Sequence, residues 1–367
     1  MNLIKITYIF LLLVFMTSCS HRVVNPKTAV NLKNDFTILN IFFATDRKEN
    51  KNLDLKNRFS GEIGKLKYGI TKVSIPCGYK NCKHDVGELE SPIWWKFEFK
   101  EDPKKHVVML EINTTDKLSY FEKLSKRIKQ SNEKSALIFI HGYNVTFEDA
   151  ARRTAQMAYD LKFDGAAVFY SWPSYGDPLK YPADEENIML STKNIEFFLN
   201  DFLDKSNAKN IYLIAHSMGN RALTQAYINV VKNNPKLKKR FKEIILTAPD
   251  INADIFKRDI APLMVKAGNP ITLYVSSSDI ALKASKKFHN HFRAGDSSQE
   301  IIILPGIESI DSTNVNTSFL GHSYFPEEKS VINDIFYIIH KGLRANQRAD
   351  LNKFSNQNGG IYWKFRQ

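Results

Sequence analysis

Residues 211–219 read Ile-Tyr-Leu-Ile-Ala-His-Ser-Met-Gly, and this stretch decides the fold of the chain. Its first four residues are apolar or aromatic and of strand character, and residues 220–231 that follow it have the composition of a helix. The residues between strand and helix are mostly small, which permits a tight turn. The stretch therefore predicts a buried strand, a sharp turn that carries Ser217, and a helix that packs back against the strand.

A serine on such a turn stands where a nucleophile is needed. A free serine hydroxyl is a weak nucleophile and requires an exposed, fixed position beside a base. The string Ala215-His216-Ser217-Met218-Gly219 departs from the G-x-S-x-G elbow only at its first residue, where alanine is still small. We therefore interpret Ser217 as a catalytic nucleophile. The alternative is a buried serine that caps the following helix.

Composition and charge narrow the class of protein. The chain has 367 residues, of which 43% are hydrophobic and 25% charged, as in globular proteins. Its 52 Lys and Arg residues outnumber 39 Asp and Glu residues, for a formal net charge of +13. Such an excess favours contact with anionic surfaces such as lipid headgroups or cell-wall polymers. No helix-turn-helix, zinc-finger or aromatic RNA-binding pattern stands out, so we expect no nucleic-acid partner.

The first residues have the pattern of an export signal. A short basic start, an apolar run over residues 6–16 and small residues after it predict a signal peptide over residues 1–18. Met16-Thr17-Ser18-Cys19 resembles a bacterial lipoprotein box, which implies that Cys19 is acylated and becomes the mature N-terminus. In that sorting rule Ser20 favours the outer membrane, with the protein facing the periplasm and residues 19–35 as a tether. The alternative is ordinary cleavage near this point.

Two further cysteines lie close together in a glycine-containing stretch, Cys77-Gly78-Tyr79-Lys80-Asn81-Cys82. In an exported chain this spacing predicts a disulfide between Cys77 and Cys82. Metal binding is the weaker alternative, because only His84 lies nearby as a further ligand. We expect no metal site.

The rest of the chain predicts an α/β fold with a strand-rich N-terminal part and, from residue 136, a regular alternation of strands and helices. Apolar strands that alternate with helices indicate a mostly parallel central sheet covered on both faces. We expect one domain over residues 36–343 and a tail over 344–367 whose aromatic end docks back onto the domain. The expected strands are 36–44 (ended by Thr45-Asp46-Arg47), 68–75, 94–100, 107–112, 136–140, 166–170, 211–214, 243–248, 271–276 and 301–304; the expected helices are 118–130, 147–161, 185–203, 218–231, 253–263, 281–288 and 327–343.

The carboxyl ends of the strands are where sites form in open α/β sheets. The strand at 136–140 delivers His141-Gly142-Tyr143-Asn144 to that edge. Gly142 allows a close approach of the backbone, and we expect the amides of Tyr143 and Met218 to form an oxyanion hole. The alternative is a plain turn in which His141 is a packed residue.

The base and the acid are expected after later strands. His322 follows the last expected strand and precedes the last helix, which is where the order Ser, acid, His places the base. Asp279, after the strand at 271–276, is our preferred acid. Asp250, after the strand at 243–248, is the alternative, although it could instead cap the helix that starts near Asn252.

Taken together, these motifs resemble an uncharacterised bacterial family of α/β-hydrolase-fold proteins, described as esterase- or lipase-like domains of unknown function. The resemblance runs from Phe43-Ala44-Thr45-Asp46-Arg47 to about His340 and includes Tyr170-Ser171-Trp172-Pro173-Ser174 and Ala248-Pro249-Asp250. It implies a hydrolase fold and a serine triad, and supplies no substrate. The aromatics of the segment that follows, Trp172, Tyr175 and Tyr181, either line an acyl pocket or pack that long loop down.

The expected function is hydrolysis of carboxylic esters through an acyl-enzyme, on a small acyl-ester or lipid substrate, without metal or cofactor. Ser217 attacks, His322 carries the proton, and Asp279 orients His322. The same residues could serve an acyltransferase or an amidase. A rival class is a non-catalytic interaction lipoprotein of the cell envelope that keeps the fold.

Overall fold

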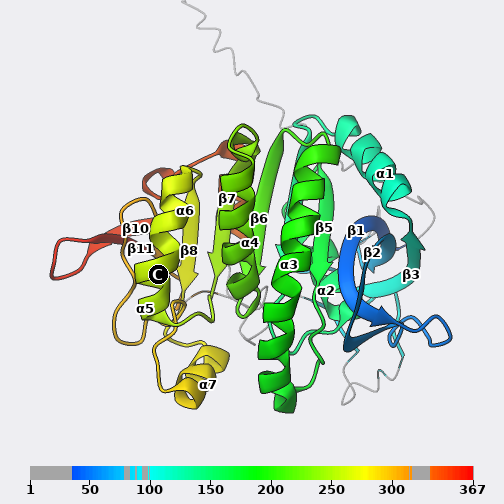
Figure 1. The fold of residues 1–367 in the computed structure, drawn as a ribbon, viewed down its shortest axis with the longest axis horizontal. Helices are drawn as coiled ribbons and strands as arrows, with labels where there is room; N and C mark the ends of the chain where they lie inside the picture. Colours follow the sequence, from blue (N-terminus) through cyan, green and yellow to red (C-terminus); the bar gives the residue numbers. More distant parts are fainter. Residues whose placement is uncertain are drawn as a thin grey trace, which may run out of the picture.

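The computed structural model describes residues 35–77, 83–86, 89–92, 98, 100–313, 315 and 331–366. These residues form one sheet in the order β10-β11-β9-β8-β7-β6-β4-β5-β1-β2-β3 (Figure 1). Each neighbouring pair in the central run β11-β9-β8-β7-β6-β4-β5-β1 is parallel. The pairs at the two edges, β1–β2, β2–β3 and β10–β11, are antiparallel. The strands are β1 (Thr37–Glu49), β2 (Phe59–Ile75), β3 (Val108–Thr115), β4 (Ser135–Ile140), β5 (Ala166–Ser171), β6 (Asn210–His216), β7 (Phe241–Thr247), β8 (Ile271–Val275), β9 (Glu308–Asp311), β10 (Leu351–Ser355) and β11 (Ile361–Phe365).

Helices cover both faces of the sheet, as predicted. One hydrophobic cluster packs the sheet against α1 (Lys117–Gln130), α3 (Tyr181–Lys205), α4 (Gly219–Asn233) and α6 (Ala261–Ala267), which lie in front in Figure 1. A second cluster packs the opposite face against α2 (Phe147–Asp160) and α8 (Val331–Lys341). Two short helices, α5 (Ala253–Ile255) and α7 (Ile280–His289), complete the set, and α7 lies beyond the carboxyl ends of the strands.

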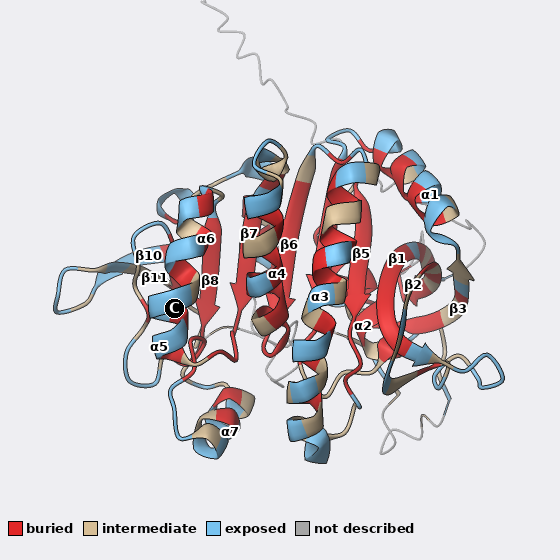
Figure 2. Ribbon diagram, viewed as in Figure 1, coloured by how far each residue is buried: buried red, intermediate tan, exposed pale blue. Residues whose placement is uncertain are grey.

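The central strands are buried along their whole length, which explains their unbroken apolar sequences. Every residue of β4, β5 and β8 is buried, and so is β6 after its first residue (Figure 2). A strand between two helical layers has no solvent face, so it shows no alternation of polar and apolar residues. This is why the sequence predicts the parallel part of the sheet well.

Two predicted strand boundaries are wrong. Residues 301–304 form no strand, and β9 comes later, at Glu308–Asp311. Pro305 and Gly306 turn the chain between them, with Gly306 at φ +89°, and the carbonyl of Ile302 accepts a hydrogen bond from Ser309 Oγ at 2.6 Å. Likewise β1 does not end at Thr45, because it continues to Glu49 and keeps Arg47 buried.

The C-terminal residues extend the sheet. β11 pairs in parallel with β9, with Trp363 opposite Ile310, and β10 closes the edge as the other half of a hairpin. The prediction that the aromatic end docks back onto the domain is confirmed. Residues 351–365 therefore belong to the same sheet and are not a detached tail.

Several predictions fall outside the described residues. These are the signal peptide, Cys19 and nearly all of the tether, most of the strand at 94–100, Cys82 and His322. Cys77 is buried at the end of β2, and its pairing with Cys82 stays a prediction. Among the described helices, none has the length and apolar character needed to cross a membrane.

Candidate active site

Ser217 occupies a strained turn between β6 and α4. Its φ is +50°, in the left-handed region that non-glycine residues rarely adopt and that costs about 1–3 kcal/mol. Neighbouring groups hold the turn: the Ser217 N–H donates to the carbonyl of Thr247 at 3.0 Å, and the Ser217 carbonyl accepts from the Asp250 N–H at 3.2 Å. The N-cap of α4 is Met218, without a side-chain bond, so the alternative of Ser217 as a helix cap is wrong.

Left-handed residues also follow the two strands beside β6. Asn144 after β4 has φ +57°, and Ala248 after β7 has φ +45°. The three strands are adjacent in the sheet, so three sharp turns stand side by side at its carboxyl edge. Strained backbone of this kind persists only where the surroundings over-determine it, and it gathers at functional sites.

The loop after β4 lies directly against the nucleophile turn. A Cβ built on Gly142 would stand 3.0 Å from Ser217 Cβ and 3.0 Å from His216 Nδ1, so only glycine fits there without displacement. Within the described part of the chain, no acceptor takes the N–H of Tyr143 or of Met218. The N–H of Met218 is also one of the unsatisfied donors at the start of α4. Both N–H groups therefore remain available as donors, and their role in an oxyanion hole stays a prediction.

The next two amides of the same loop are already in use, which fixes its course. The Asn144 N–H donates to Asp184 Oδ2 at 3.1 Å, and the Val145 N–H donates to Ser174 Oγ at 3.0 Å. Asp184 is fully buried and also accepts from Ser174 Oγ and from the N–H of Tyr175. The start of α3 thus holds the β4 loop and the β5 loop together.

Arg47 is the residue that the sequence interpretation missed. It is 1% exposed and reaches from β1 into both loops. Burial lowers the pKa of Arg47 to about 10, and the negative charge of nearby Asp184 limits this decrease. Arg47 therefore remains a cation at neutral pH. Its guanidinium donates to Ser171 Oγ and to the carbonyls of Ser174 (2.6 Å), Val145 (2.7 Å) and Ser60 (3.2 Å).

His141 is a packed residue of the loop, which was the alternative interpretation. Its Nδ1 donates to the Gly142 carbonyl at 2.8 Å, so Nε2 is the acceptor that faces Ser171 and Arg47. Burial and Arg47 lower the pKa of His141 well below its usual value, and the ring is neutral. Trp172 stacks on it with ring centroids 5.0 Å apart and donates Nε1–H to its carbonyl.

This placement decides between the two interpretations of the aromatics after β5 for Trp172. Trp172 is 0% exposed and packs the loop, so it does not line an acyl pocket in this structure. Tyr175 is 40% exposed, and its place in a pocket stays a prediction. The Tyr181 hydroxyl donates a hydrogen bond to Asp250 Oδ2, after β7, at 2.6 Å. The centre of its ring lies 5.1 Å from that of Tyr143.

The two candidate acids have different surroundings. Asp279 follows β8 and is the N-cap of α7, where its Oδ1 accepts the Leu282 N–H at 2.9 Å. Asp250 is 2% exposed and is held by two arginines, with Arg221 Nη2 at 3.1 Å and Arg293 Nε at 3.2 Å. The suggestion that Asp250 caps the helix near Asn252 is wrong, because Asn252 itself is the N-cap of α5.

Thr313, which precedes His322 in the chain, contacts the turn just before Asp279. Thr313, nine residues before His322, bonds through Oγ1 to the N–H of Ser277 at 2.9 Å and through its carbonyl to Ser278 Oγ at 3.2 Å. These bonds hold Ser277 and Ser278, just before Asp279, against Thr313. The position of His322 itself stays a prediction.

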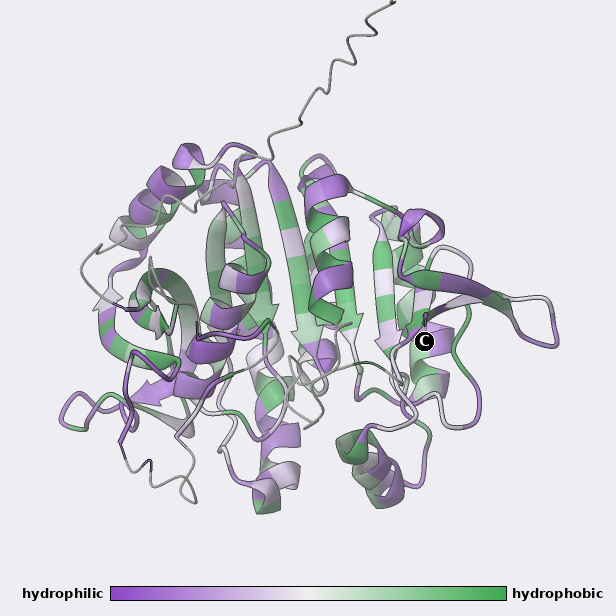
Figure 3. Ribbon diagram, turned by 180° about the vertical axis from the view of Figure 1, so that it is seen from behind, coloured by the Kyte–Doolittle hydropathy of each residue, from purple (hydrophilic) through white to green (hydrophobic). Residues whose placement is uncertain are grey.

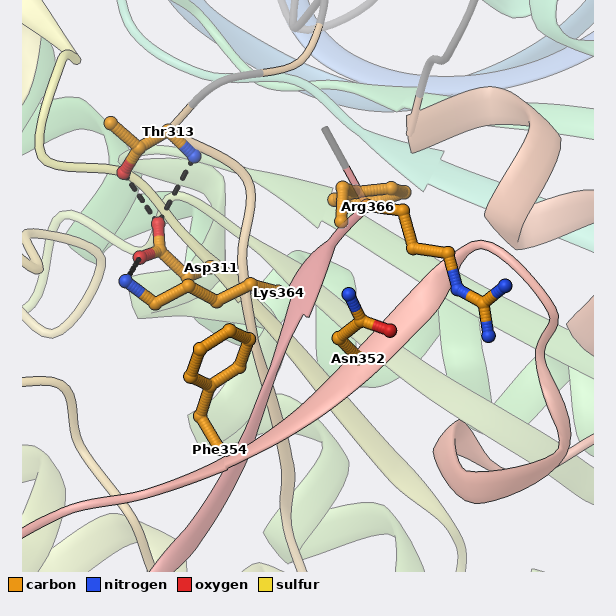
Figure 4. A pocket seen from close by; sticks show the side chains of 7 residues that line it. Asp311, Thr313, Asn352, Phe354, Lys364 and Arg366 are labelled. Carbon is orange, nitrogen blue, oxygen red and sulfur yellow. Dashed lines mark hydrogen bonds and ion pairs between the residues drawn. The ribbon is translucent and has the colours of Figure 1, made fainter.

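Two cavities bear on the location of a substrate. One of about 180 Å³ lies behind the β4 loop and is lined by His141, Gly142 and His216, among others. A larger one, of about 660 Å³, lies at the C-terminal hairpin (Figure 4). There Lys364 pairs with Asp311 at 3.1 Å, and neither Ser217 nor the β4 loop contributes to it. We therefore place no chemistry in the larger cavity.

The strand order, the turn at Ser217 and the glycine loop beside it define an α/β-hydrolase. Residues 116–340 match the model of a family described as "Alpha/beta hydrolase of unknown function", and the chain belongs to this family. A search of the curated proteins finds no match.

Among the solved structures that the chain matches are hydrolases and esterases of low sequence identity. An esterase of the fungus Rhizomucor miehei is 12% identical, with 82% of each chain covered and a TM-score of 0.36. A CIB-like hydrolase of Thermoplasma acidophilum is 16% identical over 64% of this chain and 88% of its own, with a TM-score of 0.31. An esterase of Pyrobaculum calidifontis is 13% identical over 60% of this chain and 91% of its own, also at 0.31. None of the residue roles below rests on these likenesses.

Proposed function

We propose that this chain is a serine hydrolase that cleaves carboxylic esters through an acyl-enzyme on Ser217. The observation that carries the proposal is the left-handed Ser217 with the available N–H groups of Met218 and Tyr143 at its side. An ester carbonyl above Ser217 Oγ would place its oxygen between those two donors, where the negative charge develops during attack.

In the proposed reaction His322 takes the proton from Ser217 Oγ as the oxygen attacks the carbonyl carbon. The oxyanion accepts the N–H groups of Met218 and Tyr143, and His322 then gives its proton to the leaving alcohol. Water then attacks the acyl-enzyme with the same proton transfers through His322 and releases the carboxylic acid. Asp279 keeps the imidazole oriented and balances its charge. Its cap bond uses Oδ1, and Oδ2 is the oxygen that we assign to His322.

The test is hydrolysis of p-nitrophenyl esters of graded acyl length by the purified chain and by Ser217→Ala. We expect turnover by the wild type and a loss of several orders of magnitude in the variant, at an unchanged melting temperature. If the wild type and Ser217→Ala hydrolyse every ester at the same rate, the proposal fails.

We further propose that the chain is exported and held at the periplasmic side of the outer membrane by acylated Cys19, with Cys77 and Cys82 joined as a disulfide. A single acyl chain binds a membrane only marginally, so several chains are needed for a stable anchor. Closing so short a loop is worth roughly 2 kcal/mol in the chain-entropy account of disulfides. Mass spectrometry of the membrane fraction should find an acylated N-terminal Cys19. Non-reducing peptide maps should find the peptides of Cys77 and Cys82 linked by a disulfide. An unmodified N-terminus or free thiols would contradict these assignments.

A further inference from the structure

The rim of the site carries exposed apolar side chains. On α7, Ile280 is 72% and Phe288 is 63% exposed, and Phe292 just after the helix is 39% exposed. Leu179, two residues before α3, is 87% exposed. All of these belong to segments that extend past the carboxyl ends of the strands (Figure 1). Large apolar side chains gathered at one rim indicate a contact surface.

Lysines accompany these apolar residues. Lys283, Lys286 and Lys287 line a groove of about 480 Å³ together with Phe292. Lys286 lies 3.8 Å from the centre of the Phe292 ring and 3.6 Å from buried Asp296. Lys283 and Lys287 have no carboxylate partner within the described residues. Figure 3 shows the resulting mixture of strongly polar and strongly apolar residues along α7.

The helix is anchored below by its inner side and at its end, where His289 Nε2 lies 2.8 Å from Glu185 Oε1. Only Leu282 and Ser285 of α7 are buried, and Ser285 Oγ donates to Asp250 at 2.6 Å. The ring of Phe288 packs on Tyr181 at 5.7 Å, and Tyr181 packs on Tyr143. A line of aromatic rings thus runs from the oxyanion loop to the exposed surface of α7.

We propose that α7 docks on an anionic phospholipid bilayer, with Phe288 and Ile280 inserted at the level of the acyl-chain boundary and Lys283 and Lys287 on lipid phosphates. The two halves of this surface match the two layers that it would meet, because apolar side chains enter the interface while cations remain at the phosphates. Docking would turn the Ser217 edge of the sheet toward the bilayer. It requires neither the ester hydrolysis proposed above nor the acyl anchor proposed at Cys19.

The experiment places a tryptophan on α7 and asks whether lipid quenches it. Full-chain Phe288→Trp is mixed with vesicles of phosphatidylglycerol and phosphatidylcholine brominated near the top of the acyl chains. The signal is the fluorescence in excess of the wild type, which carries the same native tryptophans. The matched control is Phe197→Trp, because Phe197 is a helical phenylalanine of comparable exposure, at 50% against 63% for Phe288. It stands about 24 Å along α3 from the rim. The comparison is valid even if the N-terminal segment attaches the chain to the vesicles.

We expect strong quenching for Phe288→Trp and little for Phe197→Trp. Adding Lys283→Gln with Lys287→Gln should lower the docked-to-undocked ratio about 25-fold, since each lysine near an anionic surface contributes about fivefold. Lys236→Gln with Lys239→Gln, the same charge change near the start of β7 and so at the opposite edge of the sheet, should have little effect. Equal quenching of the two tryptophans, or equal effects of the two lysine pairs, would overturn the proposal. So would release of α7 by inorganic phosphate at constant ionic strength, which would indicate a site for free phosphate.

Discussion

The backbone of Gly142 stands so close to Ser217 that a Cβ on Gly142 would lie 3.0 Å from the Cβ of Ser217. This contact brings the loop after β4 against the turn after β6, and the next residue of that loop is Tyr143, whose N–H we propose as an oxyanion donor. The first prediction follows from it. Gly142→Ala should force the loop back by a few tenths of an ångström and weaken one oxyanion donor. We expect kcat to fall on the order of 10²-fold with KM little changed.

Gly360→Ala is the control for this variant, because a Cβ there would also be tight, 3.1 Å from Ile303 Cγ2, but at the C-terminal hairpin. Its kcat should be normal. Steady-state kinetics on a p-nitrophenyl ester measure both variants, and a fully active Gly142→Ala would remove the β4 loop from the site.

Arg47 supports the same loop from below. Arg47→Lys keeps the charge and loses the fork that serves Val145, Ser174 and Ser171 together. Buried carbonyls left without donors cost about 1–3 kcal/mol each, so we expect a loss of about 3 kcal/mol in urea unfolding and a lower kcat. Arg58→Lys is the control: Arg58 is a partly exposed partner of Glu49, and its replacement should cost less than 1 kcal/mol. Equal effects of the two substitutions would contradict the role of Arg47.

The two aspartates should separate activity from stability. Asparagine is as good an N-cap as aspartate, so Asp279→Asn should melt normally while losing on the order of 10⁴-fold in kcat. Asp250→Asn removes the charge that faces Arg221 and Arg293 and should cost about 3–5 kcal/mol of stability. Rates and thermal melts of both variants provide the comparison. An active Asp279→Asn beside an inactive, stable Asp250→Asn would transfer the role of acid to Asp250.

A buried histidine outside the site predicts a pH dependence of stability. His84 bonds Glu90 at 2.8 Å and Asp160 at 2.7 Å. Burial alone would lower its pKa, but the bonds to Asp160 and Glu90 prevail and raise the pKa to about 9. A raised pKa stabilises the fold in full below about pH 6.5, and this contribution disappears as the pH rises through about 9. The free energy of unfolding should therefore fall over this window, by on the order of 3 kcal/mol.

The control is exposed His291. His84→Gln should flatten the pH profile of urea unfolding between pH 6.5 and 9, whereas His291→Gln should leave it as in the wild type. A His84→Gln profile with the wild-type slope would show that His84 is not the responsible group.

The sequence predicts the parallel core because burial on both faces imposes unbroken apolar strands, and it predicts Ser217 because the turn needs small residues around the nucleophile. It does not predict the strand beyond the turn at Pro305-Gly306, since 301–304 are all apolar and favour a strand, whereas β9 contains Glu308 and Ser309 and is selected by its pairing with β8.

The support of the site is harder to predict than its nucleophile. Arg47 looks like the end of a strand, and its role depends on loops about 100 residues later in the chain. Asp250 and Asp279 both follow apolar strands, and only the folded packing distinguishes them, with Asp250 against two arginines and Asp279 at the N-cap of α7. The presence of Arg47 in the stretch that resembles the family was the one available signal.

The central claim is that Ser217 is an activated nucleophile. The most direct measurement is labelling of the purified chain with a fluorophosphonate probe, followed by peptide mapping of the adduct by mass spectrometry. We predict one phosphonate on the peptide that contains Ser217, absent after heat denaturation and absent from Ser217→Ala. An unlabelled wild type, under conditions in which a control esterase is labelled, or an adduct on another residue, would contradict the account.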